Sequence, residues 1–243
     1  MKIAVCIKRV PDSETRIRIA LDGKSLDPAG VNFDLSPYDE YAIEEALRIQ
    51  AARPGTEVVA LSAGPAEAQT QLRKALAMGA DRGILLKGDF PFWDAAPAAA
   101  ALAGALKALG PDLVLFGKQA SDSDALQVPA FVAQALGIPL VTVVTKLELA
   151  EASLTAHRQV EGGHEVVTLP LPAALTCQKG LNTPRFASLP NIMKAKKKPL
   201  EEMAVTVQAP RTQALSLALP PVRKSGRIVG QGADAVPALV LAL

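Results

Sequence analysis

Short apolar segments alternate with longer helical patterns over the first 150 residues, and this alternation constrains the fold more than any other feature. Each segment is apolar on both faces, which is typical of strands buried in a parallel sheet. The expected strands span residues 3–7, 57–62, 83–87, 112–116 and 141–149. Strand and helix in strict alternation predict an α/β fold, with a mostly parallel sheet and helices on both faces.

Helix-start and helix-stop residues separate these strands. Helices are expected over residues 37–52, 66–78 and 94–109, and a fourth from near 123–126 to 136. The first has the clearest start: Ser36 can cap it, Pro37 suits its first turn, and acidic residues follow at its positive end.

The pattern changes after residue 150. Segments 153–160 and 164–169 flank a glycine turn and predict a hairpin, and a short strand is expected over 173–176. An earlier hairpin turn is expected at Asp22-Gly23. Residues 181–198 have the composition of a long loop, and the proline-containing stretch 199–243 that of an extended arm.

We therefore expect two parts, a nucleotide-binding α/β domain over 1–190 and a loop end with an arm over 191–243. An arm of this length suggests a partner subunit on which it packs. The alternative is an arm that wraps back on its own domain.

Composition excludes several classes of function. Apolar residues make up 49% and charged residues 21%, as in folded proteins, and a net charge of +2 gives no field that favours nucleic acid. Two cysteines and two histidines exclude a disulfide framework and four-cysteine metal sites. The longest uncharged stretch, 125–145, contains two prolines and is a poor membrane span. Without a signal peptide at the start, we expect a cytoplasmic protein, with no catalytic or metal-binding residue.

The usual glycine-rich dinucleotide and triphosphate motifs are absent from the sequence. Three strand ends nevertheless carry small or polar residues, at 6–9, 62–65 and 117–122. Small residues let a base or ribose lie against the backbone, and the expected helix start near 123–126 is a natural phosphate site. Asp122 or Asp124 could accept from ribose hydroxyls or cap that helix. Two interpretations of these strand ends remain: a mononucleotide site, or ordinary turns between strands and helices.

The segment 189–198 combines apolar residues with four lysines in its last five positions, and no acidic residue falls between Glu165 and Glu201. This composition fits a docking loop, with Leu189 as an apolar anchor, Ile192 and Met193 beside it, and a basic patch that steers acidic partners. The alternative is a solvated basic loop.

Four segments resemble one known family, the β subunits of electron transfer flavoprotein. They are RQVEGGHE at 158–165, LNTPRFASLPNIMKAKKK at 181–198, ALAMGADRG at 75–83 and GKQA at 117–120. The resemblance implies a Rossmann-like, doubly wound fold of the adenine-nucleotide α-hydrolase-like type. It also implies an αβ heterodimer in which the α subunit holds most of the redox FAD and the β subunit binds a structural AMP.

The same resemblance implies an electron carrier rather than an enzyme. Such a heterodimer takes electrons from acyl-CoA dehydrogenases of fatty acid β-oxidation and from related flavin dehydrogenases, and passes them to a membrane quinone oxidoreductase. Leu189 matches the family's docking anchor, and Lys194 and Lys197 match lysines that tune docking. The implied AMP contacts are Cys6, Ser36, Pro37, Tyr38, Asp39, Ala63, Gly117, Lys118, Gln119, Ala120, Ser121, Asp122, Ser123, Asp124, Ala125, Leu126, Gln127 and Val128.

Two departures from the family pattern keep alternatives open. Ser13 stands where mitochondrial forms have a tyrosine near the flavin, and the Val128 side of the nucleotide loop resembles electron-bifurcating relatives. In those NADH-oxidising enzymes a second FAD replaces AMP. We favour AMP, because Leu189-Pro190-Asn191 is kept as in non-bifurcating carriers. A third hypothesis is a stand-alone nucleotide-binding protein of the universal-stress type, which would be a homodimer without flavin.

Overall fold

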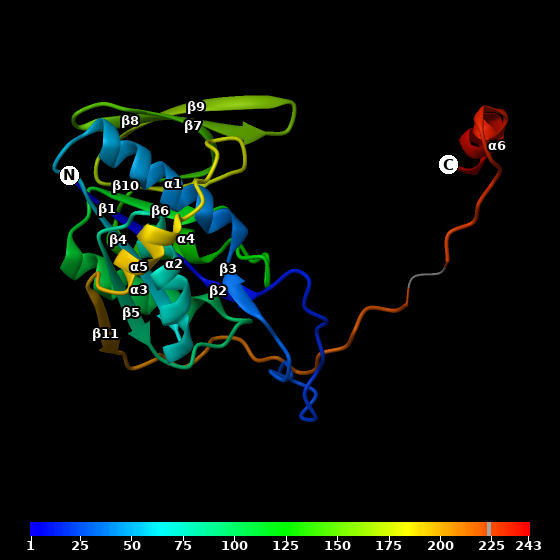
Figure 1. Ribbon diagram of the computed structural model, residues 1–243, viewed down its shortest axis with the longest axis horizontal. Coiled ribbons are helices and arrows are strands. Elements are labelled where there is room, and N and C mark those ends of the chain that lie inside the picture. The colour runs from blue at the N-terminus through cyan, green and yellow to red at the C-terminus, as the bar shows by residue number, and fades with distance from the viewer. Residues whose placement is uncertain (223–224) are drawn as a thin grey trace.

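The computed structural model describes residues 1–222 and 225–243. Within them the chain forms an α/β domain built on a nine-stranded sheet, with helices on both faces (Figure 1). The sheet order is β11-β5-β4-β1-β6-β10-β7-β8-β9. The strands are β1 Lys2–Cys6, β4 Glu57–Gly64, β5 Arg82–Lys87, β6 Leu113–Gly117, β7 Leu140–Leu149, β8 Ser153–Val160, β9 Gly163–Pro170, β10 Ala173–Cys177 and β11 Leu200–Ala204.

The sheet is doubly wound, as the sequence predicted. From β1 the chain moves outward through β4 and β5, then returns to the other side of β1 to form β6. The strands from β11 to β7 pair in parallel, and β8 and β9 extend that edge as an antiparallel hairpin. The winding direction changes between β1 and β6, and ligands bind at such switch points in open α/β sheets.

Two helices cover each face of the sheet, and side-chain alternation along the strands divides the core between them. Ile3 and Val5 face the layer of α1 (Pro37–Ala52) and α2 (Gln69–Met78), which follows the single 3-10 turn η1 (Ala66–Ala68). Ala4 and Cys6 face the layer of α3 (Ala95–Leu109) and α4 (Val128–Leu136). Burial of this aliphatic surface, at roughly 25 cal/mol per Å², is the main force holding the layers together.

The short strand expected over residues 173–176 is present, and its place in the sheet had not been predicted. The short strand expected after the hairpin is β10, and it lies between β6 and β7 in the parallel part of the sheet. All five of its residues are buried. β10 follows β9 in the chain but is separated from it in the sheet by β7 and β8, and this position buries both of its apolar faces.

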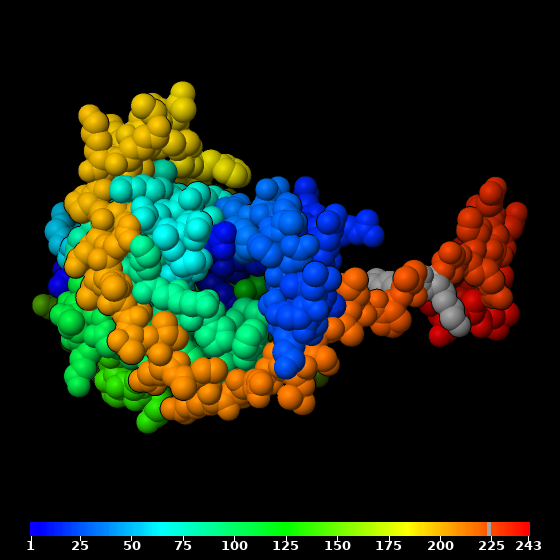
Figure 2. All heavy atoms as spheres, turned by 90° about the horizontal axis from the view of Figure 1, so that it is seen from below, coloured from blue at the N-terminus to red at the C-terminus, as the bar shows by residue number. Residues whose placement is uncertain are grey.

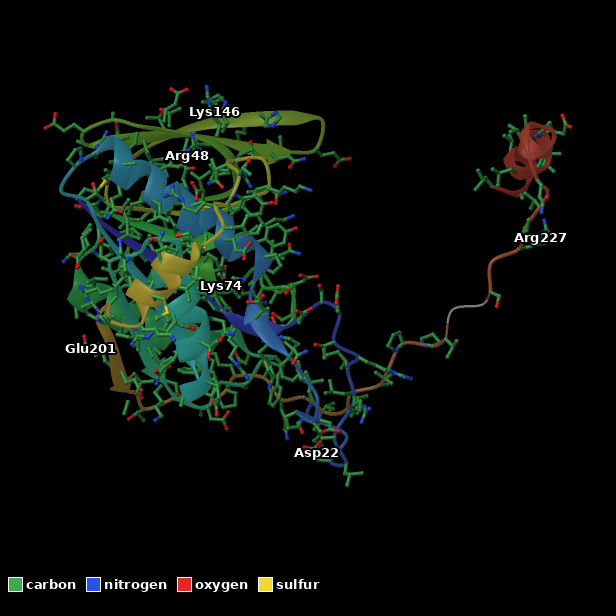
Figure 3. All side chains as sticks on the ribbon, viewed as in Figure 1. Asp22, Arg48, Lys74, Lys146, Glu201 and Arg227 are labelled. Atoms are coloured by element: carbon green, nitrogen blue, oxygen red, sulfur yellow. The ribbon has the colours of Figure 1, made fainter. Side chains whose placement is uncertain are left out.

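The segment between β1 and α1 was expected to hold one hairpin, and it holds more. Arg9–Pro11 (β2) and Phe33–Leu35 (β3) form a separate two-stranded antiparallel sheet. The hairpin about Asp22-Gly23 is reduced to a single bridge between Ile19 and Leu26. The Asp22 carboxylate accepts from the backbone N–H groups of the two residues after Gly23 and fixes the turn, which protrudes at the lower edge of the domain (Figure 3).

The expected long loop at 181–198 was wrong in one respect, because it contains a short helix, α5 (Leu189–Ala195). Ser188 caps this helix by accepting from the N–H of Asn191. The next segment, β11, pairs with β5 and extends the sheet. After Ala204 the chain continues as an arm whose first part stays on the domain, where Val205 packs against the core. The arm ends in η2 (Ala233–Ala235) and α6 (Val236–Ala242), away from the domain (Figure 1).

Two expected helix starts also differ. Ser36 makes no side-chain cap to α1; its hydroxyl instead points to the carbonyl of Gln119. The fourth helix, α4, begins at Val128 rather than near 123–126, and the residues before it form turns. Among the helices of the described residues, none has the length and apolarity needed to cross a membrane.

Candidate functional site

A cavity of about 970 Å³ opens at the carboxyl ends of β1, β4 and β6. It lies at the switch point of the sheet, where the doubly wound topology brings together three strand ends that are far apart in sequence. Figure 2 shows the molecule hollowed here, with residues near the N-terminus visible inside. The volume is at the upper end of the range for small-molecule sites.

Most residues that the resemblance assigned to nucleotide binding line this cavity. They are Cys6, Asp39, Ala63, Gly117, Lys118, Gln119, Ala120, Ser121, Asp122, Ser123, Ala125, Leu126, Gln127 and Val128. In the part of the chain that the structure describes, Ser36, Pro37, Tyr38 and Asp124 do not reach the cavity wall. Ser13, at the position of the family's tyrosine, does lie on it.

Asp39 joins the first turn of α1 to two strand ends. Its Oδ2 accepts from the backbone N–H of Lys8 at 2.7 Å, and its Oδ1 accepts from that of Gly117 at 3.2 Å. The carboxyl is buried, and burial raises its pKa to about 7 despite these hydrogen bonds. Asp39 thus holds α1, β1 and β6 in register at the floor of the cavity.

Gly117 is the residue that allows this close approach. A Cβ built on Gly117 would lie 2.7 Å from the backbone nitrogen of Asp39 and 2.7 Å from the carbonyl carbon of Tyr38. Real Cβ contacts with backbone are not that short, so a side chain here would push α1 away from β6.

A salt bridge crosses the cavity edge between Lys8 after β1 and Asp122 in the loop after β6, with Nζ and Oδ2 2.8 Å apart. The carboxylate of Asp124 accepts from Nε2 of Gln119 at 2.7 Å. Two roles were left open for Asp122 and Asp124, ribose binding and helix capping. Neither carboxylate caps α4. Asp124 and Leu126 have φ values of 47° and 55°, so this loop is held in a backbone conformation that side chains disfavour.

The two cysteines are unreactive in this environment. Cys6 lies on the cavity wall and Cys177 at the end of β10, and both are buried. Burial raises the pKa of both thiols, because a thiolate would lose its hydration. Cys6 therefore contributes shape to the cavity rather than a nucleophile.

The arm forms part of the cavity wall, which the sequence did not predict. Leu217 to Pro220 line the cavity, and the N–H of Leu217 donates to the carbonyl of Gly23 at 2.8 Å. The Asp94 carboxylate caps α3 and also accepts from the N–H groups of Arg211 and Thr212. From the sequence, Asp94 could be recognised only as a residue at a helix start. Its contacts with the arm could not be predicted, because those partners lie more than 100 residues away.

The expected docking segment is on the surface, away from the cavity. Leu189 is 73% exposed at the start of α5, and Ile192, Met193, Lys194 and Lys197 are exposed too. The segment carrying α5 protrudes at the upper edge of Figure 2. Lys198 differs from the other lysines, because its Nζ donates to three backbone carbonyls, among them that of Ala80 at 2.7 Å.

A family model described as the electron transfer flavoprotein domain matches residues 25–208. The chain belongs to the electron transfer flavoprotein family. A β subunit from Bradyrhizobium diazoefficiens is 41% identical over 248 residues, which is 98% of this chain and 97% of the relative. One from Syntrophomonas wolfei is 40% identical over 226 residues, 93% of this chain and 88% of the relative.

Another relative is the caffeyl-CoA reductase-Etf complex subunit CarD of Acetobacterium woodii. It is 38% identical over 243 residues, which is 94% of this chain and 92% of the relative. The predicted resemblance and the predicted fold class are confirmed by these matches and by the observed sheet. Membership places the chain in electron transfer, as a β-type subunit of a flavin-associated complex.

Proposed function

We propose that the chain is the β subunit of a heterodimeric electron transfer flavoprotein, a carrier and not an enzyme in its own right. It binds AMP, holds a flavin-bearing α subunit, and docks flavin dehydrogenases, acyl-CoA dehydrogenases among them. The heterodimer passes their electrons to a quinone oxidoreductase. The observation that carries this proposal is α5, a short helix that presents apolar side chains to solvent beside lysines.

The docking proposal follows from the composition of this surface. Leu189, Ile192 and Met193 give a small apolar contact, and Lys194 and Lys197 stand at its edge. Charges at the rim of an interface speed encounter with an acidic partner, and a small apolar anchor leaves dissociation fast. A carrier that must visit successive partners needs both properties.

The proposed occupant of the cavity is AMP, placed at the three strand ends. Ala63, Gly117 and Ala120 leave the backbone open to a base or ribose. Lys8, Arg9 and Lys118 are the cations of the cavity lining, and the pairing of Lys8 with Asp122 offsets a carboxylate charge that would repel a phosphate. No nucleophile or metal ligand is required for such a structural role.

A second FAD in place of AMP is the alternative that one observation favours. The cavity extends from the strand ends to an apolar outer wall formed by Trp93, Leu217 and Leu219, and this volume exceeds what a mononucleotide needs at the strand ends. Under this alternative the chain is a subunit of a bifurcating flavoprotein. The stand-alone stress-type hypothesis is not favoured, because it gives the arm and α5 no role.

The proposed α-subunit contact is the arm with its terminal helix. Outside the domain, Ile228, Val240, Leu241 and Leu243 are all more than half exposed. Apolar residues exposed in this number mark an interface with another protein. The FAD held mainly by that α subunit would supply the one-electron and two-electron chemistry, which no side chain of this chain provides.

The proposal is tested by electron uptake from a dehydrogenase. The chain is purified with its α subunit, and flavin reduction is followed after mixing with a substrate-reduced acyl-CoA dehydrogenase. We expect Leu189→Ala to lower the second-order rate constant roughly tenfold, because a buried leucine anchor contributes about 1.5–3 kcal/mol. The bound FAD and AMP should not change. An unaltered rate constant would overturn the docking proposal.

A further inference from the structure

The helix α5 packs against α2 but buries little side-chain surface of its own. It has seven residues, and Ala195 is its single buried residue, while Leu189, Ile192 and Met193 face solvent. A helix this short is marginal in water unless tertiary contacts fix it. Its orientation on the domain therefore depends on polar contacts at its two ends as well as on its packing against α2.

At the C-terminal end of α5, one nitrogen of Arg73 provides the contact. Nη1 of Arg73, on α2, donates to the carbonyl of Ala195 at 2.7 Å and to that of Lys198 at 2.7 Å. The last carbonyls of a helix have no partner within it, and a cation at this end also interacts favourably with the helix dipole.

Lys198 makes the reverse contact. Its ammonium donates to the carbonyls of Leu76, Gly79 and Ala80, at 3.1, 3.0 and 2.7 Å. These carbonyls lie at the C-terminal end of α2, the helix that carries Arg73. Three carbonyls match the three N–H donors of an ammonium group. Each helix end is thus capped by a cation from the other segment.

A third contact fixes the chain before α5. Nε and Nη2 of Arg185 donate to the two carboxylate oxygens of Glu44, at 2.8 and 2.9 Å, and the backbone N–H of Arg185 donates to Glu44 as well. Glu44 lies on α1 and is buried. The exposed helix is therefore fastened on one side to α1 and on the other to α2.

We infer that Arg73 and Lys198 form a reciprocal clasp that fixes the orientation of α5 for docking, and that they act as positioning residues for electron uptake. This inference rests on the proposed docking function. A preformed surface needs no ordering when the partner arrives, so the clasp raises affinity without contacting the partner.

The test compares variants of the chain purified with its α subunit, with a substrate-reduced acyl-CoA dehydrogenase as the electron donor. Arg73→Met should raise the dehydrogenase concentration for half-maximal uptake roughly tenfold, as expected for loss of hydrogen bonds to a charged group. The limiting rate and the FAD content should not change. Lys198→Met should give the same shift, and Arg73→Lys should restore most of the affinity, because both bonds come from one nitrogen.

Arg53→Met is the matched control. Arg53 also donates from a guanidinium to a backbone carbonyl, that of Leu149, but it lies at the end of α1 next to β7. We expect this variant to leave uptake unchanged. An equal loss in Arg53→Met and Arg73→Met would mean general destabilisation and would overturn the inference.

Combination with Leu189→Ala separates this inference from the proposed function. If Leu189→Ala alone leaves uptake unchanged, the docking function itself is wrong. If Leu189→Ala slows uptake while Arg73→Met and Lys198→Met do not, only the clasp is wrong. A positioning role predicts that Arg73→Met and Leu189→Ala combine to less than the sum of their separate effects, and full additivity would overturn it.

Discussion

The domain and the arm contain similar aliphatic residues, but the domain buries them and the end of the arm exposes them to solvent. Leu115 in β6 has no exposed surface, whereas Leu241 in α6 is 90% exposed. In the domain, helices cover both faces of the sheet; at the end of the arm, no described residue of the domain packs on α6 (Figure 1). Equal hydrophobicity thus stabilises the chain in one region and leaves exposed apolar surface in the other.

The inner part of the arm, up to about residue 220, lies on the domain and connects it to the exposed end. Asp94 accepts from two of its backbone N–H groups, and Leu217 bonds to Gly23 across the cavity mouth. Beyond this point the arm extends outward past Arg227, far from the domain (Figure 3). The inner part of the arm is therefore seated on the domain by these polar contacts and by Val205, which packs against the core, whereas apolar residues of the outer part are exposed.

The same substitution, leucine to alanine, should have different effects in the domain and in the arm. Leu115→Ala should lower the free energy of unfolding by about 3 kcal/mol, because it leaves a cavity in a closed core. Leu241→Ala should leave unfolding within about 0.5 kcal/mol and instead weaken α-subunit binding. Urea unfolding and copurification with the α subunit check both. Equal destabilisation by the two variants would contradict the distinction.

A second prediction concerns the cavity floor. Gly117→Ala should lower the free energy of unfolding by about 2 kcal/mol, since the new Cβ would press on the backbone of α1. It should also reduce the nucleotide that copurifies. Gly104→Ala is the control, because its Cβ meets nothing within 4 Å on α3, and alanine should stabilise that helix by about 0.5–1 kcal/mol. If Gly117→Ala is as stable as wild type, the close approach of α1 to Gly117 does not constrain this position.

Stability should also depend on pH through Asp39. Its pKa is raised by burial from 3.8 to about 7, so the folded protein binds a proton that the unfolded chain releases. The stabilising contribution of this carboxyl is complete below pH 3.8 and is lost as pH rises through about 7. A carboxyl ¹³C titration should give a midpoint near 7 for Asp39. A midpoint at the ordinary value of 3.8 would contradict the burial argument.

The smallest expected effect is electrostatic. Lys194→Gln with Lys197→Gln should slow electron uptake from an acidic dehydrogenase roughly threefold at low ionic strength, and the difference should vanish in high salt. Lys107→Gln, an exposed lysine at the end of α3, is the control and should change nothing. Uptake by the double variant that equals wild type at low salt would leave these lysines without a steering role.

The sequence predicted the parts of this molecule that depend on local pattern. The strands from 3–7 to 141–149 and the first three helices were found close to their expected positions, because apolar runs and caps are local signals. Residues at the ends of three strands could be assigned to one site, since parallel topology alone brings strand ends together.

The sequence could not predict features that depend on distant partners. Residues 173–177 resemble any short apolar strand, and their place in the sheet depends on pairing with β6 and β7, which are not indicated by the residues themselves. In the sequence Lys198 is indistinguishable from its exposed lysine neighbours, but its ammonium donates hydrogen bonds to carbonyls about 120 residues earlier. Asp94 signals a helix cap, and nothing near it in sequence indicates that it also holds the arm.

The ligand content of the purified heterodimer tests our proposal that this chain is the AMP-binding half of an electron carrier. The chain is purified with its α subunit, the ligands are released with acid, and FAD and AMP are quantified per heterodimer. We expect one FAD and one AMP. Two FADs and no AMP would contradict this proposal and would make the cavity beside Gly117 part of the redox machinery.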